Sequence, residues 1–269
     1  MATATQSLAH LFGIPEQELR KSLIELTVDW HADVSPEEQV LHHLGYTDRV
    51  LPPPSGIRWF HASRVLPGTT FEEGILPTTG RLPQLWNALK EFAREWLSED
   101  QWRQYQLDFA NSDRQFAAQF RRKEQFLGPG MWEGPFAFLV RDAAVGAVGD
   151  HIDFTAMPEC LEDICGDFEE VFGKPLGAAF RQATRPCLVV FTRPGDWPGA
   201  VRAAASYVYR SLQGLDHDRA CNTCFDGEGE AVPLSWIDAV EWIGGTVGSA
   251  DASRSAGHDG SKASDPPQP

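Results

Sequence analysis

The sequence contains no apolar run of the about 20 residues that a helix needs to cross a bilayer. Its first residues also lack the basic start, apolar stretch and small-residue cleavage site of a secretory signal peptide. The 5 cysteines are odd in number, lie between Cys160 and Cys224, and do not resemble the disulfide framework of a secreted domain. These absences predict a cytoplasmic protein with no membrane partner.

Basic residues are also scarce, since 23 Lys and Arg stand against 38 Asp and Glu, for a net charge of −15. Such a surface repels a phosphate backbone, so we expect no direct binding to the backbone of a nucleic acid. A basic protein partner, or a small ligand in a local positive pocket, remains compatible with the charge. The basic cluster Arg121–Lys123 is expected to be an exposed helix face.

Several common signatures are missing. The chain has no G-x-x-x-x-G-K-[ST] phosphate loop, no G-x-G-x-x-G, no H-E-x-x-H and no G-x-S-x-G. The sequence therefore shows none of the familiar motifs of nucleoside triphosphatases, Rossmann enzymes, zinc proteases or serine hydrolases.

What is present indicates an ordinary globular protein, with 42% hydrophobic and 23% charged residues. Residues 1–50 read as a helical N-terminal region, where Ser35, Pro36 and Glu38 form a helix-start pattern. The proline-rich stretch LPPPSG then opens a body at 51–245. The tail at 246–269 is rich in Gly, Ser, Ala, Asp and Pro, and we expect it to be disordered.

The body is predicted to be α+β, with a mixed, mostly antiparallel sheet core and a long helical insertion at 82–126. Aromatic residues spaced by three and four positions along this insertion are expected to be core. The segment 197–212 is compatible with a helix or a pair of strands. The other expected elements are strands at 57–62, 136–141, 186–193 and within 230–243, and helices at 160–172 and 176–182.

The most informative segment is WFHASRVLPGTTFEEGILP at 59–77, where a strand ends in His61 and Ser63. Residues two apart on a strand project to one face. Together these side chains can hydrogen-bond the hydroxyls and amide of a nucleotide-like ligand. The alternative is a partly buried structural histidine bonded to backbone carbonyls.

This segment resembles the first motif of the ADP-ribosyltransferases of the diphtheria-toxin and poly(ADP-ribose) polymerase type. In that family a strand ending in His-x-Ser/Thr is followed by a helix leading to Gly-Ile/Leu-x-Pro. His61 and Ser63 match the first part, and Gly74-Ile75-Leu76-Pro77 matches the second. The resemblance implies that His61 binds the ribose of NAD and that Ser63 supports it.

A second segment, GPFAF at 134–138, is similar to the family's Gly-x-Tyr-Phe strand before a helix. The resemblance places Phe136 where a tyrosine stacks on nicotinamide, and phenylalanine keeps the stacking face without the hydroxyl. The family's second stacking aromatic is missing, since the chain reads AVG at 147–149. The alternative is that Phe136 and Phe138 are core residues.

A third segment, DGEGEAVPLSWI at 226–237, resembles the family's last motif, in which a catalytic glutamate opens a strand. Cleavage of the nicotinamide–ribose bond develops positive charge that a carboxylate stabilises. Glu230 is the first candidate and Glu228 the second. Their Glu-x-Glu spacing belongs to a different branch from the His-x-Ser motif, and a solvated acidic turn is the alternative.

A separate pattern is the C-x-x-C pair of Cys221 and Cys224, with His217 upstream. Two thiolates at this spacing suit a tetrahedral zinc, and His217 or the pair Cys160 and Cys165 could supply further ligands. A redox-active dithiol and ordinary free cysteines are the other interpretations.

The sequence thus predicts an NAD-using, ADP-ribosyltransferase-like protein that transfers ADP-ribose to an unknown acceptor without a metal. His61 and Glu230 are its expected catalytic residues, and Ser63, Phe136 and Glu228 join His61 in binding NAD. The alternatives are a non-catalytic, acidic interaction or regulatory protein, and a regulatory protein that zinc stabilises at the cysteine pair. A single cleft holding His61, Phe136 and Glu230 favours the enzyme.

Overall fold

An antiparallel sheet forms the centre of the molecule. The computed structural model describes residues 3–46, 55–126, 134–146, 155–197 and 199–244. The 5 strands run in the order β4-β2-β1-β3-β5, and each neighbouring pair is antiparallel. This arrangement confirms the expected α+β class. The strands are β1 (Gly56–Val65), β2 (Phe136–Phe138), β3 (Arg185–Pro194), β4 (Cys224–Asp226) and β5 (Ile237–Trp242).

The pair of long strands β1 and β3 carries the sheet. They pair along their whole length, from Gly56 opposite Pro194 to Val65 opposite Arg185. The continuous apolar run of β3 is buried, with Leu188 to Phe191 fully inaccessible, as expected for a strand covered on both faces. The strand predictions at 57–62 and 186–193 are therefore confirmed.

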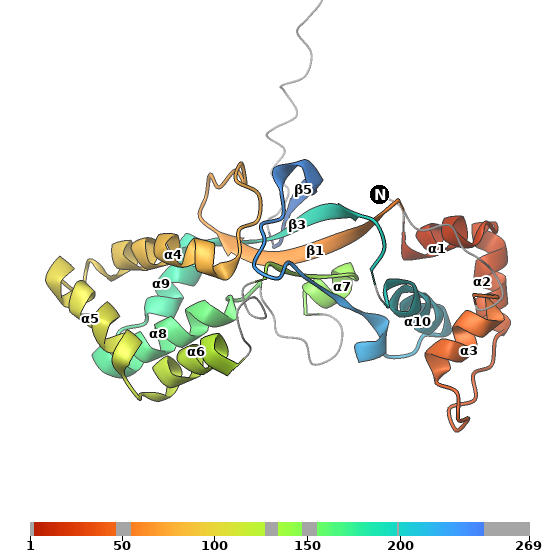
Figure 1. The fold of residues 1–269 in the computed structure, drawn as a ribbon, viewed down its shortest axis with the longest axis horizontal. Coiled ribbons are helices and arrows are strands. Elements are labelled where there is room, and N and C mark those ends of the chain that lie inside the picture. The colour runs from red at the N-terminus through yellow and green to blue at the C-terminus, as the bar shows by residue number, and fades with distance from the viewer. Residues whose placement is uncertain (1–2, 47–54, 127–133, 147–154, 198, 245–269) are drawn as a thin grey trace, which may run out of the picture.

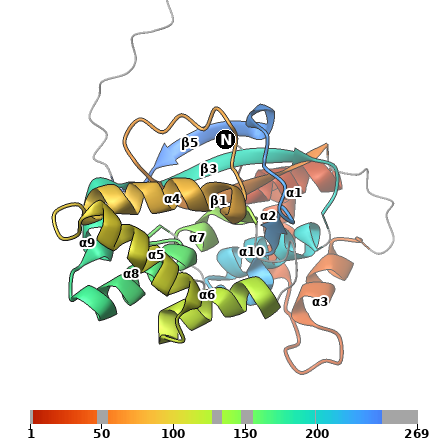
Figure 2. The ribbon, with the colours of Figure 1, turned by 60° about the vertical axis from the view of Figure 1, so that its left-hand side comes forward.

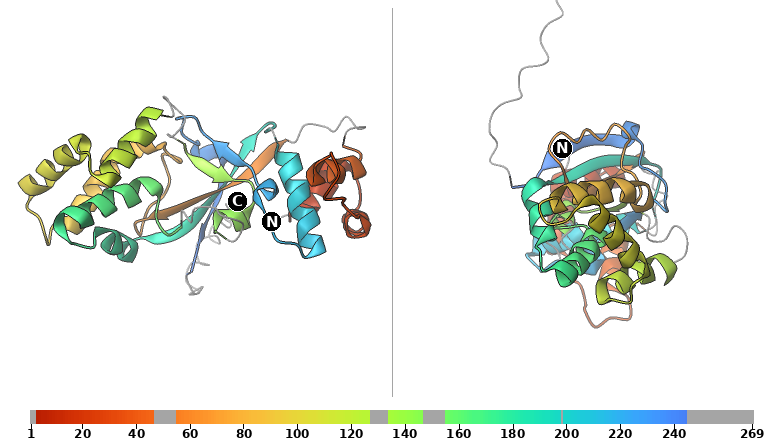
Figure 3. Two further views of the ribbon diagram at one scale, coloured as in Figure 1. Left: turned by 90° about the horizontal axis from the view of Figure 1, so that it is seen from below. Right: turned by 90° about the vertical axis from the view of Figure 1, so that its left-hand side faces the viewer.

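Two groups of helices cover opposite ends of this sheet (Figure 1). α4, α5, α6, α8 and α9 gather at one end, whereas α1, α2, α3 and α10 gather at the other, and the view from below in Figure 3 keeps this division. Among the described helices, none is both long and apolar enough to span a membrane. The helices are α1 (Ala4–Phe12), α2 (Glu16–Glu25), α3 (Pro36–His43), α4 (Thr78–Ala93), α5 (Glu99–Asn111), α6 (Gln115–Phe126), α7 (Arg141–Ala144), α8 (Glu159–Phe172), α9 (Leu176–Ala183) and α10 (Ala200–Gln213), with 3-10 turns η1 (Arg219–Cys221) and η2 (Leu234–Trp236).

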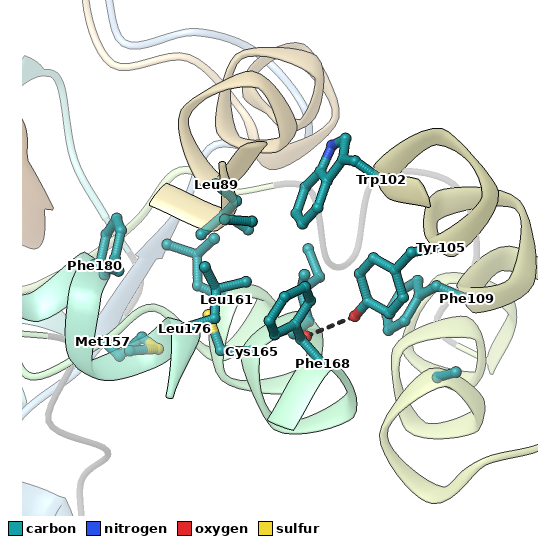
Figure 4. Close-up of a cluster of buried hydrophobic side chains, with 13 residues drawn as sticks. Leu89, Trp102, Tyr105, Phe109, Met157, Leu161, Cys165, Phe168, Leu176 and Phe180 are labelled. Carbon is teal, nitrogen blue, oxygen red and sulfur yellow. Dashed lines mark hydrogen bonds between the residues drawn. The ribbon is translucent and has the colours of Figure 1, made fainter. Parts of the chain in front are cut away.

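The first helical group packs around the aromatic stripe of the predicted insertion (Figure 4). Trp102, Tyr105 and Phe168 are buried in it, and the Tyr105 hydroxyl donates to the carbonyl of Ile164 at 2.9 Å. The prediction that the stripe is core is confirmed. The insertion is three helices rather than one, because Ser98 caps a new helix start through a capping box with Gln101.

The second helical group joins the N-terminal region to the body. α1, α2 and α3 share one apolar cluster with Ala205, Val208 and Tyr209 of α10. The segment that was compatible with helix or strand is thus a helix, because one of its faces is covered by the N-terminal helices. The predicted cap is also present, since the Ser35 hydroxyl accepts a hydrogen bond from the amide of Glu38.

Some local predictions are wrong or incomplete. The short helix expected between Ser63 and Gly74 does not form, because Gly68, Phe71 and Gly74 all have positive φ angles that interrupt a right-handed helix. Strand β2 ends at Phe138, since α7 begins at Arg141. The linker residues 51–54, the AVG positions at 147–149 and the tail from residue 246 lie outside the described residues.

Candidate functional site

A cavity of about 370 Å³ lies where the sheet meets the first helical group. This volume lies within the usual range for small-molecule sites. Figure 2 brings that helical group forward, with β1 and β3 behind it. The lining residues come from β1, the start of α4, α6, β2 and the start of α8: His61, Ala62, Ser63, Arg64, Leu76, Thr78, Thr79, Arg81, Leu82, Leu85, Phe120, Lys123, Pro135, Phe136, Phe138, Pro158, Glu159, Cys160 and Leu161.

His61 occupies the wall that β1 contributes. Its Nδ1 lies 2.6 Å from the carbonyl oxygen of Phe136 on the neighbouring strand β2. Burial is the main cause that lowers the pKa of His61 to about 4, and the nearby Arg81 charge adds to it, although the Phe136 hydrogen bond opposes both. The imidazole is therefore neutral at pH 7. Because a carbonyl only accepts, Nδ1 carries the proton and Nε2 is left as an acceptor.

Ser63 and Phe136 line the same cavity as His61. Ser63 is buried two positions further along β1, whereas the Phe136 ring is only partly buried at the cavity wall. Phe138 is 6% exposed and also belongs to a core cluster with Ala62 and Leu188. The structure thus brings together three of the residues that the sequence singled out, and it shows that Phe136 is not simply a core residue.

Arg81 near the start of α4 adds a positive charge that sequence reasoning missed. Its side chain lines the cavity and is partly buried, and burial lowers the pKa of its guanidinium. Within the described part of the chain, the Arg81 side chain has no carboxylate partner and no hydrogen bond. Acidic residues are preferred near a helix N-terminus, so a basic residue is unusual there. This unusual position is the signal by which the sequence could have identified Arg81.

Lys123 and Glu159 form the opposite wall. The Lys123 ammonium lies 2.8 Å from a Glu159 oxygen and 2.7 Å from an Asp163 oxygen, so α6 is tied to the start of α8. The prediction that Arg121–Lys123 is simply an exposed helix face is therefore wrong for Lys123. The third basic side chain, Arg64, donates instead to the carbonyls of Thr155, Arg181 and Thr184. Sequence reasoning missed Glu159 because its neighbours at 160–172 read only as an amphipathic helix.

Glu228 and Glu230 are exposed and do not line the described cavity. Their segment is a turn rather than the start of a strand, with a positive φ at Glu228. Two sets of backbone hydrogen bonds nevertheless fix it beside the cavity. The amide of Gly229 donates to Gly134 at 3.0 Å, and Val232 exchanges two bonds of 2.9 Å with Ile75.

These backbone hydrogen bonds, at Gly134 and Ile75, join the Glu230 segment to residues that directly precede the cavity lining in sequence. Gly134 leads directly into Pro135 and Phe136, and Ile75 leads into Leu76. Glu230 lies between these two sets of hydrogen bonds, so its backbone is held at the border of the cavity. Two of the three segments that carry the family resemblance therefore line the cavity, and the third is hydrogen-bonded to residues that lead into its walls.

The cysteine pattern does not assemble into a cluster. Cys221 is buried with its sulfur 3.7 Å from the Ser206 hydroxyl, whereas Cys224 is exposed. His217 stacks on Tyr207 with ring centroids 4.7 Å apart. In the parts of the chain that the structure describes, no group of three or more His, Cys, Asp or Glu side chains could hold a metal. Of the two further cysteines considered as ligands, Cys165 is in the helical core and Cys160 lines the cavity.

In comparisons with protein-family models, with curated proteins and with solved structures, nothing matches this chain.

Proposed function

We propose that this protein binds NAD in the cavity beside His61 and transfers ADP-ribose to an acceptor. The observation that supports the proposal is that two of the three sequence segments line one cavity, while the third is held beside it by backbone hydrogen bonds. His61 and Ser63 come from β1, Phe136 comes from β2, and the backbone of Glu230 is anchored at the border.

In this proposal each residue has a step. The free Nε2 of neutral His61 accepts a hydrogen bond from a ribose hydroxyl, and the Phe136 ring packs on the nicotinamide. The bond between nicotinamide nitrogen and ribose C1′ breaks, and nicotinamide leaves with the bonding electrons. The Glu230 carboxylate stabilises the positive charge that develops on the ribose. A nucleophile of the acceptor then bonds to C1′ and loses its proton.

The test is nicotinamide release from NAD by the purified protein. Wild type should release nicotinamide, whereas His61→Ala and Glu230→Gln should each lower the rate by about 10²-fold, as for loss of one charge-stabilising group. Glu73→Gln is the matched control, because Glu73 is an exposed glutamate in the loop that leads to Gly74. If wild type neither binds nor cleaves NAD, the proposal fails.

The second candidate is a non-catalytic interaction or regulatory protein that uses the same cavity or its acidic surface. The observation in its favour is the exposed position of Glu230, outside the described cavity wall. NAD binding that is weakened by His61→Ala, without turnover and without an effect of Glu230→Gln, would support this candidate. Metal analysis of the purified protein tests the zinc-stabilised form, for which a near-stoichiometric zinc content is required.

A further inference from the structure

The cavity contains a positive charge that nothing in the described structure balances. Arg81 lines it without a carboxylate partner, although the chain carries 38 acidic residues against 23 basic ones. Other partly buried arginines bind a carboxylate or donate to main-chain carbonyls. The Arg114 guanidinium, for example, binds both oxygens of buried Asp167 at 2.8 Å. The Arg81 guanidinium therefore lines a cavity of ligand size without an acidic partner.

The groups around Arg81 favour an anion. α4 begins at Thr78, and its N-cap residue Pro77 provides no side-chain hydrogen bond to the helix amides. The side chains of Thr78 and Thr79 line the cavity at this helix end. A helix N-terminus carries a partial positive charge, which adds to that of the guanidinium. His61 is uncharged at pH 7, so it balances neither the guanidinium nor the helix end.

The other charged groups on the cavity wall are already engaged. The Lys123 ammonium is shared between Glu159 and Asp163, and the Arg64 guanidinium donates to main-chain carbonyls. Arg81 is thus the cation of the described cavity whose hydrogen-bond donors remain for a ligand. A planar guanidinium binds two oxygens of a phosphate at once, and partial burial strengthens that bond.

We propose that Arg81, at the N-terminal end of α4, binds a phosphate group of the nucleotide that occupies the cavity. The identity of the nucleotide as NAD rests on the proposed function, whereas the phosphate site rests on Arg81, the N-terminal end of α4 and the cavity that they line. The apolar and aromatic part of the wall, including Leu82, Phe120 and Phe136, accommodates the uncharged part of the ligand.

The experiment compares ligands with and without phosphate by isothermal titration calorimetry. The probes are NAD, ADP-ribose, inorganic pyrophosphate and nicotinamide riboside, which has no phosphate. Arg81→Gln should weaken binding of the three phosphate-containing probes at least tenfold and leave nicotinamide riboside unchanged, and Arg81→Lys should restore part of the loss. Arg94→Gln is the matched control, because Arg94 follows the same helix and pairs with Glu91 away from the cavity.

The outcomes separate this inference from the proposed function. If NAD binds equally to wild type and Arg81→Gln, the phosphate site is refuted and the proposed function stands. Equal weakening of nicotinamide riboside also refutes it, because Arg81 then acts on the shape of the cavity. Arg81-dependent pyrophosphate binding in a protein that neither binds nor cleaves NAD supports the phosphate site and refutes the transferase. If wild type binds no probe, both proposals fall.

Discussion

At the scale of single residues, one hydrogen bond sets the chemistry of His61. Its Nδ1 is held by the carbonyl of Phe136 across two neighbouring strands, at 2.6 Å. The same bond fixes the tautomer and leaves Nε2 as a hydrogen-bond acceptor. Sequence reasoning left two interpretations of this histidine, a ligand-binding group or a structural residue bonded to a carbonyl. The structure shows the carbonyl bond at Nδ1, and the ligand-binding role of Nε2 belongs to the proposed function.

The low pKa of His61 predicts how stability depends on pH. Its pKa is about 4 in the folded chain, against an ordinary value of 6.5 for histidine. Between these values the unfolded chain holds the imidazole proton and the folded chain does not, so acid favours unfolding. As the pH falls from 6.5 to 4, wild type should lose stability relative to His61→Asn by about 1.4 kcal/mol per pH unit. Urea unfolding at several pH values measures this difference, and a constant difference would contradict the assignment.

At the scale of elements, a glycine holds the first and last motif segments together. Gly74 has a φ of +78°, and a Cβ added there would lie 2.1 Å from the carbonyl oxygen of Val232. Because Ile75 pairs with Val232 directly beside this contact, any residue larger than glycine would push the Glu230 segment away from the cavity. The Gly-Ile-Leu-Pro pattern is therefore required for close approach of two backbones as well as for a turn.

We expect Gly74→Ala to lower the free energy of unfolding by at least about 2 kcal/mol, since it combines backbone strain with a clash against main-chain atoms. Gly68→Ala is the matched control in the same loop. Gly68 has a φ of +90° but nothing lies within 4 Å of an added Cβ, so only strain of about 1 kcal/mol is expected. Urea denaturation measures both, and equal losses would show that the Val232 contact is not the cause.

At the scale of the whole molecule, the N-terminal helices are part of the folded body. They share an apolar cluster with α10, and the Gln213 side chain of α10 donates to the carbonyls of Leu23 and Ile24. The two helical groups therefore have different relations to the site. Three helices of the first group, α4, α6 and α8, supply residues that line the cavity, whereas the second group lies at the other end of the sheet (Figure 1).

This shared core predicts that damage in the N-terminal region destabilises the entire chain. Leu23 is 0% exposed, so Leu23→Ala should lower the stability by about 2–5 kcal/mol. Its neighbour Ile24 is 55% exposed, and Ile24→Ala should change stability by less than about 0.5 kcal/mol. Denaturation followed by tryptophan fluorescence and by circular dichroism should shift together in Leu23→Ala. A shift of only part of the signal would mean that the N-terminal helices unfold independently.

The local signals in the sequence identified most elements and three residues of the cavity. Periodicity predicted α8, α9 and the buried aromatic stripe, and a continuous apolar run predicted β3. His61 and Ser63 were found through a short pattern on β1, and Phe136 was found through a short pattern on β2. These features depend on neighbours in sequence, and such neighbours constrain the backbone directly.

Only the tertiary structure decided the features that depend on distant segments. α10 is a helix because the N-terminal helices cover its apolar face, since its own composition was compatible with helix and strand. Arg81, Lys123 and Glu159 lie more than 35 positions apart from one another in the sequence and meet only because α4, α6 and α8 pack against one end of the sheet. The charge and the burial of a cavity depend on all the elements that surround it, so no local sequence pattern predicts them.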